Sequence, residues 1–305
     1  MTLGPSSGSP RSPRLGRGNE LPKAIEFFKM SGAGNDFVVV DNRRKLFEGD
    51  VSELVRRICS RGLSIGADGV LLIEKSIRAN FRLVYYNADG SLASFCANGT
   101  RCAARFAFVN VIATGKMSIE TGWGMIGADI EGEAVTLSLP NIDGLPLPQD
   151  IVLGDRTVSG FRFDVGVPHF VRFVDEDPST VDVRNLGCEI RRHESLAPGG
   201  ANVHFVRVIS PHEGEIRSFE RGVEDETLSC GSGVVAAALT GMKLGKFRPP
   251  VQLRTRSGLP LQVAGNVLEK GFSDVRLAGD ARIVFKSHFS DETTSGFPLP
   301  ALPAA

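Results

Sequence analysis

The chain of 305 residues lacks several features that would point to particular classes of function. Its 35 Lys and Arg residues balance 35 Asp and Glu residues. A net charge of zero argues against a nucleic-acid or anionic-membrane binder driven by bulk charge. No apolar run approaches the roughly 20 residues that a membrane-spanning helix needs. Hydrophobic residues make up 42% and charged residues 23%, which is ordinary for a soluble globular protein of up to two domains.

Cysteine is scarce, and the spacing of the cysteines argues against a zinc site. The five cysteines are Cys59, Cys96, Cys102, Cys188 and Cys230. No two of them have the C-x-x-C spacing of common zinc sites, so we expect no metal. The N-terminus has no apolar stretch typical of a secretory signal. We therefore expect free thiols, a reducing compartment and a cytoplasmic protein.

The ends and the middle of the chain are low in periodicity. Residues 1–23 are rich in Ser, Pro, Gly and Arg, and residues 290–305 are rich in Pro, so both are predicted to be tails. The Pro- and Gly-rich segment 140–148 is the candidate linker. We expect an N-terminal domain over 24–143, to which a last strand at about 276–289 returns, and a C-terminal domain over 144–275.

One motif is more informative. Cys96 is followed by Gly99 and then by an Ala- and Arg-rich run that favours a helix. A cysteine at a helix N-terminus faces unpaired backbone N–H groups and the positive end of the helix dipole. This setting favours thiolate over thiol, and the same N–H groups could hold a substrate carboxylate.

The chain repeats this motif. Cys230, like Cys96, has a glycine three residues later and two alanines at the seventh and eighth positions. The match extends upstream, because Asp68 and Asn202 each lie 28 residues before their cysteine. Phe37 and Phe170 lie 59 and 60 residues before theirs. Two halves therefore share one layout, and each ends in a cysteine–helix unit.

The pattern within each half predicts the fold class. Many short strands surround one small, apolar helix, at about 103–108 and 234–239. A helix that is apolar on most faces is buried. We predict an α+β fold of two similar domains from an internal duplication. Each domain would be a curled, mostly antiparallel sheet around a central helix, with the active site in the cleft between them.

Two facing cysteines suit one kind of chemistry. One cysteine, as thiolate, removes a Cα proton, and the other, as thiol, protonates the opposite face, so a stereocentre inverts without a cofactor. The negative charge that develops on the substrate carboxylate needs preorganised donors. The backbone N–H groups that could supply them belong to Ala97, Asn98, Gly231 and Ser232.

Six stretches, in order, resemble the diaminopimelate epimerase family between about Ile25 and Phe285. They are 30–37 (MSGAGNDF), 66–69 (GADG), 87–102 (NADGS, then CANGTRC), 201–203 (ANV), 220–223 (ERGV) and 226–233 (ETLSCGSG). The resemblance implies the two-domain fold, a homodimer, and an isomerase that interconverts LL- and meso-diaminopimelate without a cofactor, in lysine and peptidoglycan precursor synthesis.

Carried across by position, the resemblance assigns the site. Cys96 and Cys230 would be the acid and base. The reacting end of the amino-acid substrate would be held by Asn35, Asn98, Gly231 and Ser232, and the distal end by Asn87, Asn202, Glu220 and Arg221. Arg221 offers a bidentate fork for a carboxylate, and Glu220 can neutralise an ammonium. His169 would hold Glu220 or orient an ammonium.

Two departures from the family pattern leave alternatives open. Ala97 stands where the family usually has Gly, and Val167 stands where the family commonly has an Asn that contacts the distal end of the substrate. One alternative is therefore a racemase of another amino acid on the same fold. A second is a non-catalytic redox protein in which Cys96 and Cys230 form a disulfide.

Overall fold

The computed structural model describes residues 25–293 and residue 297. The predicted tail at 1–23 and most of that at 290–305 lie outside this range. Within the described part of the second tail, Asp291–Thr293 form a 3₁₀ turn (η3). The backbone carbonyl of Thr293 accepts a hydrogen bond from Ser64 Oγ at 2.7 Å, so the chain rests there against the N-terminal half.

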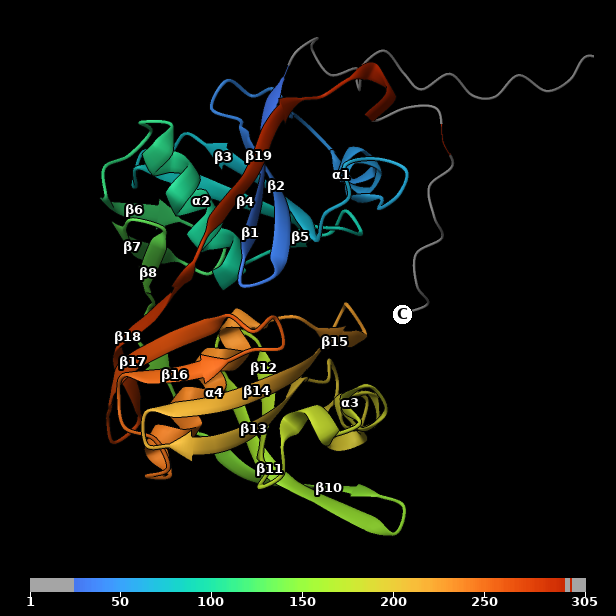
Figure 1. The fold of residues 1–305 in the computed structure, drawn as a ribbon, viewed down its shortest axis with the longest axis vertical. Helices are drawn as coiled ribbons and strands as arrows, with labels where there is room; N and C mark the ends of the chain where they lie inside the picture. The colour runs from blue at the N-terminus through green and yellow to red at the C-terminus, as the bar shows by residue number, and fades with distance from the viewer. Residues whose placement is uncertain (1–24, 294–296, 298–305) are drawn as a thin grey trace, which may run out of the picture.

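The duplication is visible in the order of the elements (Figure 1). The first half runs β1 (Glu26–Gly32), β2 (Asn35–Asp41), α1 (Ser52–Cys59), β3 (Gly69–Glu74), β4 (Phe81–Asn87), β5 (Leu92–Ala93), α2 (Ala97–Val109), β6 (Lys116–Glu120), β7 (Met125–Glu131) and β8 (Ala134–Ser138). The second runs β11 (Arg156–Asp164), β12 (Pro168–Phe173), α3 (Val183–Arg191), β13 (Asn202–Ser210), β14 (Glu213–Glu220), β15 (Asp225–Thr227), α4 (Gly231–Lys243), β16 (Val251–Arg254), β17 (Pro260–Val267) and β18 (Gly271–Asp280). Short 3₁₀ turns at Pro178–Thr180 (η1) and Glu194–Leu196 (η2) flank α3.

The strand pairings repeat as well. In the first half β2 pairs parallel with β3, and β4 with β6. In the second half β12 pairs parallel with β13, and β14 with β16. In each case a helix lies between the two parallel strands in the chain, as a parallel crossover requires. The remaining pairings are antiparallel, which confirms the predicted mixed but mostly antiparallel fold.

One helix in each half lies inside the curled sheet. α2 packs against β1, β2 and β8, and α4 packs against β17, β12 and β13. Their small side chains let the strands come close, and both helices contribute to one continuous hydrophobic core. α1 and α3 lie on the outer faces, over separate clusters of buried side chains. The predicted central helices are thus confirmed.

The two halves are joined by one strand pairing and by one continuous stretch of chain. β8 of the first half pairs with β18 of the second, and the chain continues from β18 into β19 (Arg282–His288), which pairs with β1 (Figure 1). The predicted linker contains β9 (Ile142–Asp143), which also pairs with β18, and leads into β10 (Leu147–Leu153) on β11. We propose a domain boundary near residue 143, with β19 belonging to the first domain.

The two outer helices begin differently. Asp182 caps α3, because its carboxylate accepts a hydrogen bond from Asn185 N at 3.2 Å. Asp50 accepts from Ser52 N at 3.0 Å, but the N-cap residue of α1 is Val51. Across the part of the chain that the structure describes, no helix is long and apolar enough to cross a membrane.

The counterparts of individual residues differ by one position from the predicted match. Phe37 belongs to the inner core and Val38 to the outer cluster under α1. Phe170 belongs to the outer cluster under α3, so the residue that faces inward like Phe37 is His169. By the same reasoning Gly69, which pairs with Phe37, corresponds to Asn202, which pairs with His169. Asp68 is therefore not the counterpart of Asn202.

Candidate functional site

A cavity of about 750 Å³ lies between the two halves. Its first-half walls come from the β1–β2 turn, the end of α1 and the β4–β5 hairpin, and its second-half wall from the segment 220–228. The predicted site residues on its walls are Asn35, Asn87, Cys96, Glu220 and Arg221.

The N-termini of α2 and α4 meet behind this cavity. A Cβ added to Gly231 would lie 2.8 Å from the Cβ of Ala97, so only glycine fits at the start of α4. Asn98 Nδ2 donates to Ser229 O at 3.3 Å. Cys96 and Cys230 are the N-cap residues of these two abutting helices. The structure therefore brings the two predicted cysteine units together.

Asn98 is held in place from both sides. Its Nδ2 donates to Asn35 Oδ1 at 2.5 Å, and its Oδ1 accepts from Arg101 Nη2 at 2.7 Å. Arg101 is fully buried, and its Nε also donates to the backbone carbonyl of Asp280 at 3.2 Å. This arginine fixes Asn98 and Asn35, and the sequence motif that contains it gave no indication of that role.

Both thiols are shifted away from ionisation. Burial raises the pKa of Cys96 to about 11, although a hydrogen bond from Gly99 N at 3.4 Å acts in the opposite direction. Burial, and then the charge of Glu220, raise the pKa of Cys230 well above its usual value. The expected thiolates are thus not the ground state of this site, because loss of hydration outweighs the helix N-terminal N–H groups. All five cysteines lie in the described residues and are free.

Glu220 links the cavity to Cys230. Its carboxylate accepts a hydrogen bond from the Thr227 hydroxyl at 2.5 Å and lies beside the Cys230 thiol. Burial raises the pKa of Glu220, and the Thr227 hydroxyl and the Cys230 thiol act in the opposite direction. Ser232 Oγ lies 3.8 Å from Cys230 Sγ, so the second thiol has two polar neighbours.

The residues predicted for the distal end of the substrate fall into two groups. Asn87 and Arg221 line the cavity. Asn87 Nδ2 donates to Ser91 Oγ at 3.0 Å, and Arg221 Nη1 donates to Gly199 O at 3.4 Å. Asn202 is buried, and its Oδ1 accepts from the backbone N of Arg221 at 2.9 Å. Asn202 therefore holds Arg221 rather than forming part of the wall.

His169 does not hold Glu220, contrary to one of the two predicted roles. Its ring is fully buried, and its Nδ1 lies 2.9 Å from His204 Nε2. His204 Nδ1 in turn lies 2.9 Å from Ser218 Oγ. Among the described residues, Nε2 of His169 has no hydrogen-bond partner.

A charged network supports the first-half wall. Asp68 accepts from Asn35 Nδ2 at 3.0 Å and from Arg61 at 2.8 Å. Arg61 and Lys29 also pair with Asp36. Burial acts to raise the pKa of Asp36, but the hydrogen bonds from these two cations outweigh it and hold the pKa below its usual range. The network orients Asn35, and its members lie too far apart in sequence to be recognised as a unit.

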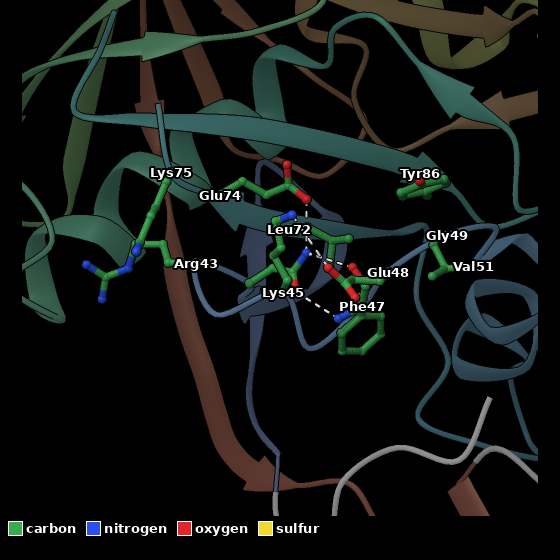
Figure 2. A pocket seen from close by; sticks show the side chains of 11 residues that line it. Arg43, Lys45, Phe47, Glu48, Gly49, Val51, Leu72, Glu74, Lys75 and Tyr86 are labelled. Carbon is green, nitrogen blue, oxygen red and sulfur yellow. Dashed lines mark hydrogen bonds and ion pairs between the residues drawn. The ribbon is translucent and has the colours of Figure 1, made fainter. Parts of the chain in front are cut away.

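A second cavity, of about 510 Å³, lies on the outer side of the first half (Figure 2). Several polar groups on its wall are paired with each other: Asn42 Nδ2 donates to Glu74 Oε1 at 2.9 Å, and Lys45 Nζ lies 3.6 Å from Glu48 Oε1. None of the predicted site residues lines it. In residues 25–293 and 297, no group of His, Cys, Asp or Glu is placed to hold a metal ion. The cleft is therefore the candidate site.

Comparison with known proteins agrees with this geometry. A family model described as "Diaminopimelate epimerase" matches residues 27–138 and 161–270, one segment in each half. A diaminopimelate epimerase of Chlorobaculum tepidum is 42% identical over 263 residues, which cover 84% of this chain and 98% of that protein. The corresponding enzyme of Aquifex aeolicus is 37% identical over 280 residues, which cover 88% and 99%.

Solved structures show the same fold at low identity. A hydroxyproline epimerase from Agrobacterium vitis superposes with a TM-score of 0.67 at 15% identity, covering 87% of this chain and 92% of its own. A PhzF-family phenazine biosynthesis protein from Bacillus anthracis gives 0.66 at 14% identity, covering 88% and 100%. These structures show the fold, and the matches in sequence show that the chain belongs to the diaminopimelate epimerase family.

Proposed function

We propose that this protein is an isomerase that interconverts LL- and meso-diaminopimelate without a cofactor, for lysine and peptidoglycan precursor synthesis. The observation that carries the proposal is the contact between Ala97 and Gly231, which joins two cysteine-capped helices, one from each half, at the cleft. Family membership gives the substrate class, a small amino acid.

In the proposed reaction the substrate Cα lies between Cys96 and Cys230. One sulfur, as thiolate, takes the Cα proton, and the electron pair that remains is delocalised onto the α-carboxylate. The other thiol gives its proton to the opposite face of Cα, so the configuration inverts. The N–H groups of Ala97, Asn98, Gly231 and Ser232 at the two helix N-termini would stabilise the charge on the carboxylate.

The thiolate must be formed inside the site, because burial raises the pKa of both thiols. The carboxylate of Glu220 lies beside Cys230 and could accept its proton. General acid–base catalysis of this kind contributes about 10²–10⁴-fold to a rate. We therefore assign Glu220 to the activation of Cys230 as well as to the distal ammonium.

The distal end of the substrate would face Asn87, Glu220 and Arg221, with Asn202 orienting Arg221 from behind. A guanidinium binds a carboxylate through two parallel hydrogen bonds, which makes it selective for a substrate with a second carboxylate. The homodimer and the cytoplasmic location that the resemblance implies are also proposals; light scattering of the purified protein tests the first, and fractionation of cells tests the second.

Val167 supports a second candidate, a racemase of another amino acid. Its apolar side chain precedes Pro168 and His169 and cannot donate the hydrogen bond that an Asn there would supply. It follows Gly166, where an added Cβ would lie 2.8 Å from the Trp123 ring of the other half, so this turn contacts both halves. A substrate with a smaller or apolar distal end would suit it.

A substrate series separates the two candidates. The reduced protein is incubated with LL-diaminopimelate, L-lysine and L-proline, and kcat/KM is measured for each by chiral chromatography. Because L-lysine lacks the distal carboxylate, we expect its kcat/KM to be lower than that of LL-diaminopimelate by at least about 100-fold. Faster turnover of either L-lysine or L-proline would contradict the proposed substrate and favour the racemase.

A further inference from the structure

A row of three buried polar side chains lies beneath the N-terminal turn of α4. It consists of His169 on β12, His204 on β13 and Ser218 on β14, and we call it the polar row. His169 and His204 are fully buried, and Ser218 is 3% exposed. Consecutive members are joined by contacts of 2.9 Å. The His204 ring packs against α4 so closely that a Cβ on Gly233 would lie 2.1 Å from it.

The corresponding row of the first half is built from Phe37, Leu71 and Tyr85, with the Tyr85 hydroxyl as its polar group. His204 pairs with Ser218 across the β13–β14 ladder, as Leu71 pairs with Tyr85 across β3–β4. Phe37 takes the place of His169, and its ring lies 6.0 Å from that of Tyr85. The fold therefore does not need imidazoles at the positions of His169 and His204. Burying them without a role would cost stability, because polar groups lose their hydration.

The hydrogen bonds allow one proton arrangement that satisfies every member except the end of the row. In the structure, the one side-chain hydrogen bond of Ser218 Oγ is with His204, so its hydroxyl proton has an acceptor only if it is given to His204 Nδ1. His204 then carries its proton on Nε2 and donates it to His169 Nδ1. His169 must in consequence carry its own proton on Nε2, the atom without a partner among the described residues.

We propose that His204, oriented by Ser218, is a positioning residue that holds His169 in the Nε2–H tautomer, as a neutral hydrogen-bond donor to a carboxylate oxygen of the bound substrate. The proposal rests on the proposed function for its ligand. Burial keeps both imidazoles neutral: it lowers the pKa of His204 to about 3 and is the main cause that lowers the pKa of His169 well below its usual value. His169 pairs with Asn202 across the β12–β13 ladder, and Asn202 Oδ1 accepts from the backbone N of Arg221, which lines the cavity. His169 therefore lies directly behind the cavity wall.

Three variants test the row. His204→Leu introduces the residue found at the corresponding position of the first half, and it removes the donor to His169. His204→Gln keeps a donor, because the amide Nε2 occupies nearly the position of the imidazole Nε2 and always carries protons. Ser218→Ala removes the group that fixes His204. Leu71→Met, a volume-conserving change in the first-half row, is the matched control.

The first readout is the tautomer of His169, taken from ¹⁵N–¹H correlation spectra of protein labelled at its five histidines. We expect Nε2–H in the wild type, in His204→Gln and in Leu71→Met, and a mixture in His204→Leu and Ser218→Ala. Nδ1–H in the wild type, or no change in His204→Leu, would overturn the proposal. This readout needs no substrate, so it remains decisive even if the proposed function fails.

The second readout is kcat/KM for LL-diaminopimelate. We expect a loss of about tenfold in His204→Leu, the usual size of one lost hydrogen bond, a smaller loss in Ser218→Ala, and recovery to within about threefold in His204→Gln. Adding Ser218→Ala to His204→Gln should change nothing further, because the amide needs no partner to set its proton. Equal losses in His204→Leu and His204→Gln, with unchanged thermal unfolding, would contradict the positioning role.

Discussion

The strands beneath the two helix N-termini of this protein present chemically different side chains. Beneath Cys96 and α2 the strands present Phe37, Leu71 and Tyr85, whereas beneath Cys230 and α4 they present the polar row. The duplication sets where the two cysteines lie. Sequence differences between the two halves make the surroundings of Cys96 and Cys230 chemically unequal. This inequality suits a reaction in which one thiol acts on one face of Cα and the other thiol acts on the opposite face.

The two thiols also differ in their exposure and in their polar neighbours. Cys96 is partly exposed and lines the cavity, while Cys230 is 4% exposed. The backbone N–H of Gly99 bonds to Cys96, and that of Gly233 acts in the same way on Cys230. Cys230 also lies beside the carboxylate of Glu220 and the hydroxyl of Ser232. The second half therefore adds side-chain chemistry to the backbone N–H that both halves supply.

Removal of either thiol should have the largest effect on activity. We expect Cys96→Ser and Cys230→Ser each to lower kcat for inversion by about a thousandfold, because an acid–base group is lost. The measurement is the rate of meso-diaminopimelate formation from the LL isomer. Cys188→Ala, on α3, is the control and should keep full activity. Turnover at the normal rate in either serine variant would exclude the two-cysteine mechanism.

Replacing the carboxylate beside Cys230 should have the next largest effect. We expect Glu220→Gln to lower kcat/KM by about 100-fold. Since burial raises the pKa of Glu220, the wild-type rate should fall as the pH is lowered through that pKa, and the variant should lack this part of the pH profile. Glu213→Gln, exposed on the same strand, should leave the profile unchanged; an identical profile in Glu220→Gln would refute the assignment.

Gly99 and Gly233, each three residues after a cysteine, report how closely the two helices pack on the strands beneath them. A Cβ on Gly233 would lie 2.1 Å from the His204 ring, while one on Gly99 would lie 3.1 Å from the flexible end of Leu71. We expect Gly233→Ala to lower the free energy of unfolding by about 2 kcal/mol through overpacking. Gly99→Ala should change it by less than about 1 kcal/mol, since alanine also favours the helix. Urea unfolding at pH 7 measures the free energy of unfolding of both variants. Equal decreases would show that α2 and α4 pack equally closely on the strands beneath them.

The polar row should also make stability depend on pH. The unfolded chain binds protons at His169 and His204 below pH of about 6.5, but burial keeps the folded chain from doing so. The free energy of unfolding should therefore fall as the pH is lowered below about 6.5, by up to about 1.4 kcal/mol per pH unit for each histidine. In His204→Gln one histidine is absent, so urea unfolding between pH 6.5 and 5 should give a shallower slope. An unchanged slope would be the contrary result.

Much of the architecture could be predicted because the repeat is a local signal. The spacing of Cys, Gly and the paired alanines predicted two cysteine-capped, buried helices. The pairing of counterparts was less secure. Phe37 and Phe170 align by residue type, but they face opposite sides of their strands, and only the observed packing shows that His169 is the inward residue.

The supporting groups of the site could not be predicted, because they depend on tertiary contacts. His204 and Ser218 are 14 residues apart and meet only through the register of two strands. Arg101 reaches across to Asp280, 179 residues away. The protonation state of the two thiols depends on a related feature, since burial, which no local pattern reports, raises the pKa of both.

The central claim, inversion at Cα by two cysteines, is tested most directly in D₂O. The reduced protein is mixed with LL-diaminopimelate, and the Cα proton and the product isomer are followed by NMR and mass spectrometry. We expect the meso isomer to appear with one solvent deuterium at the inverted Cα, and to form about a thousandfold more slowly in Cys96→Ser and Cys230→Ser. Absence of both exchange and inversion, with all thiols shown to be free, would contradict the account.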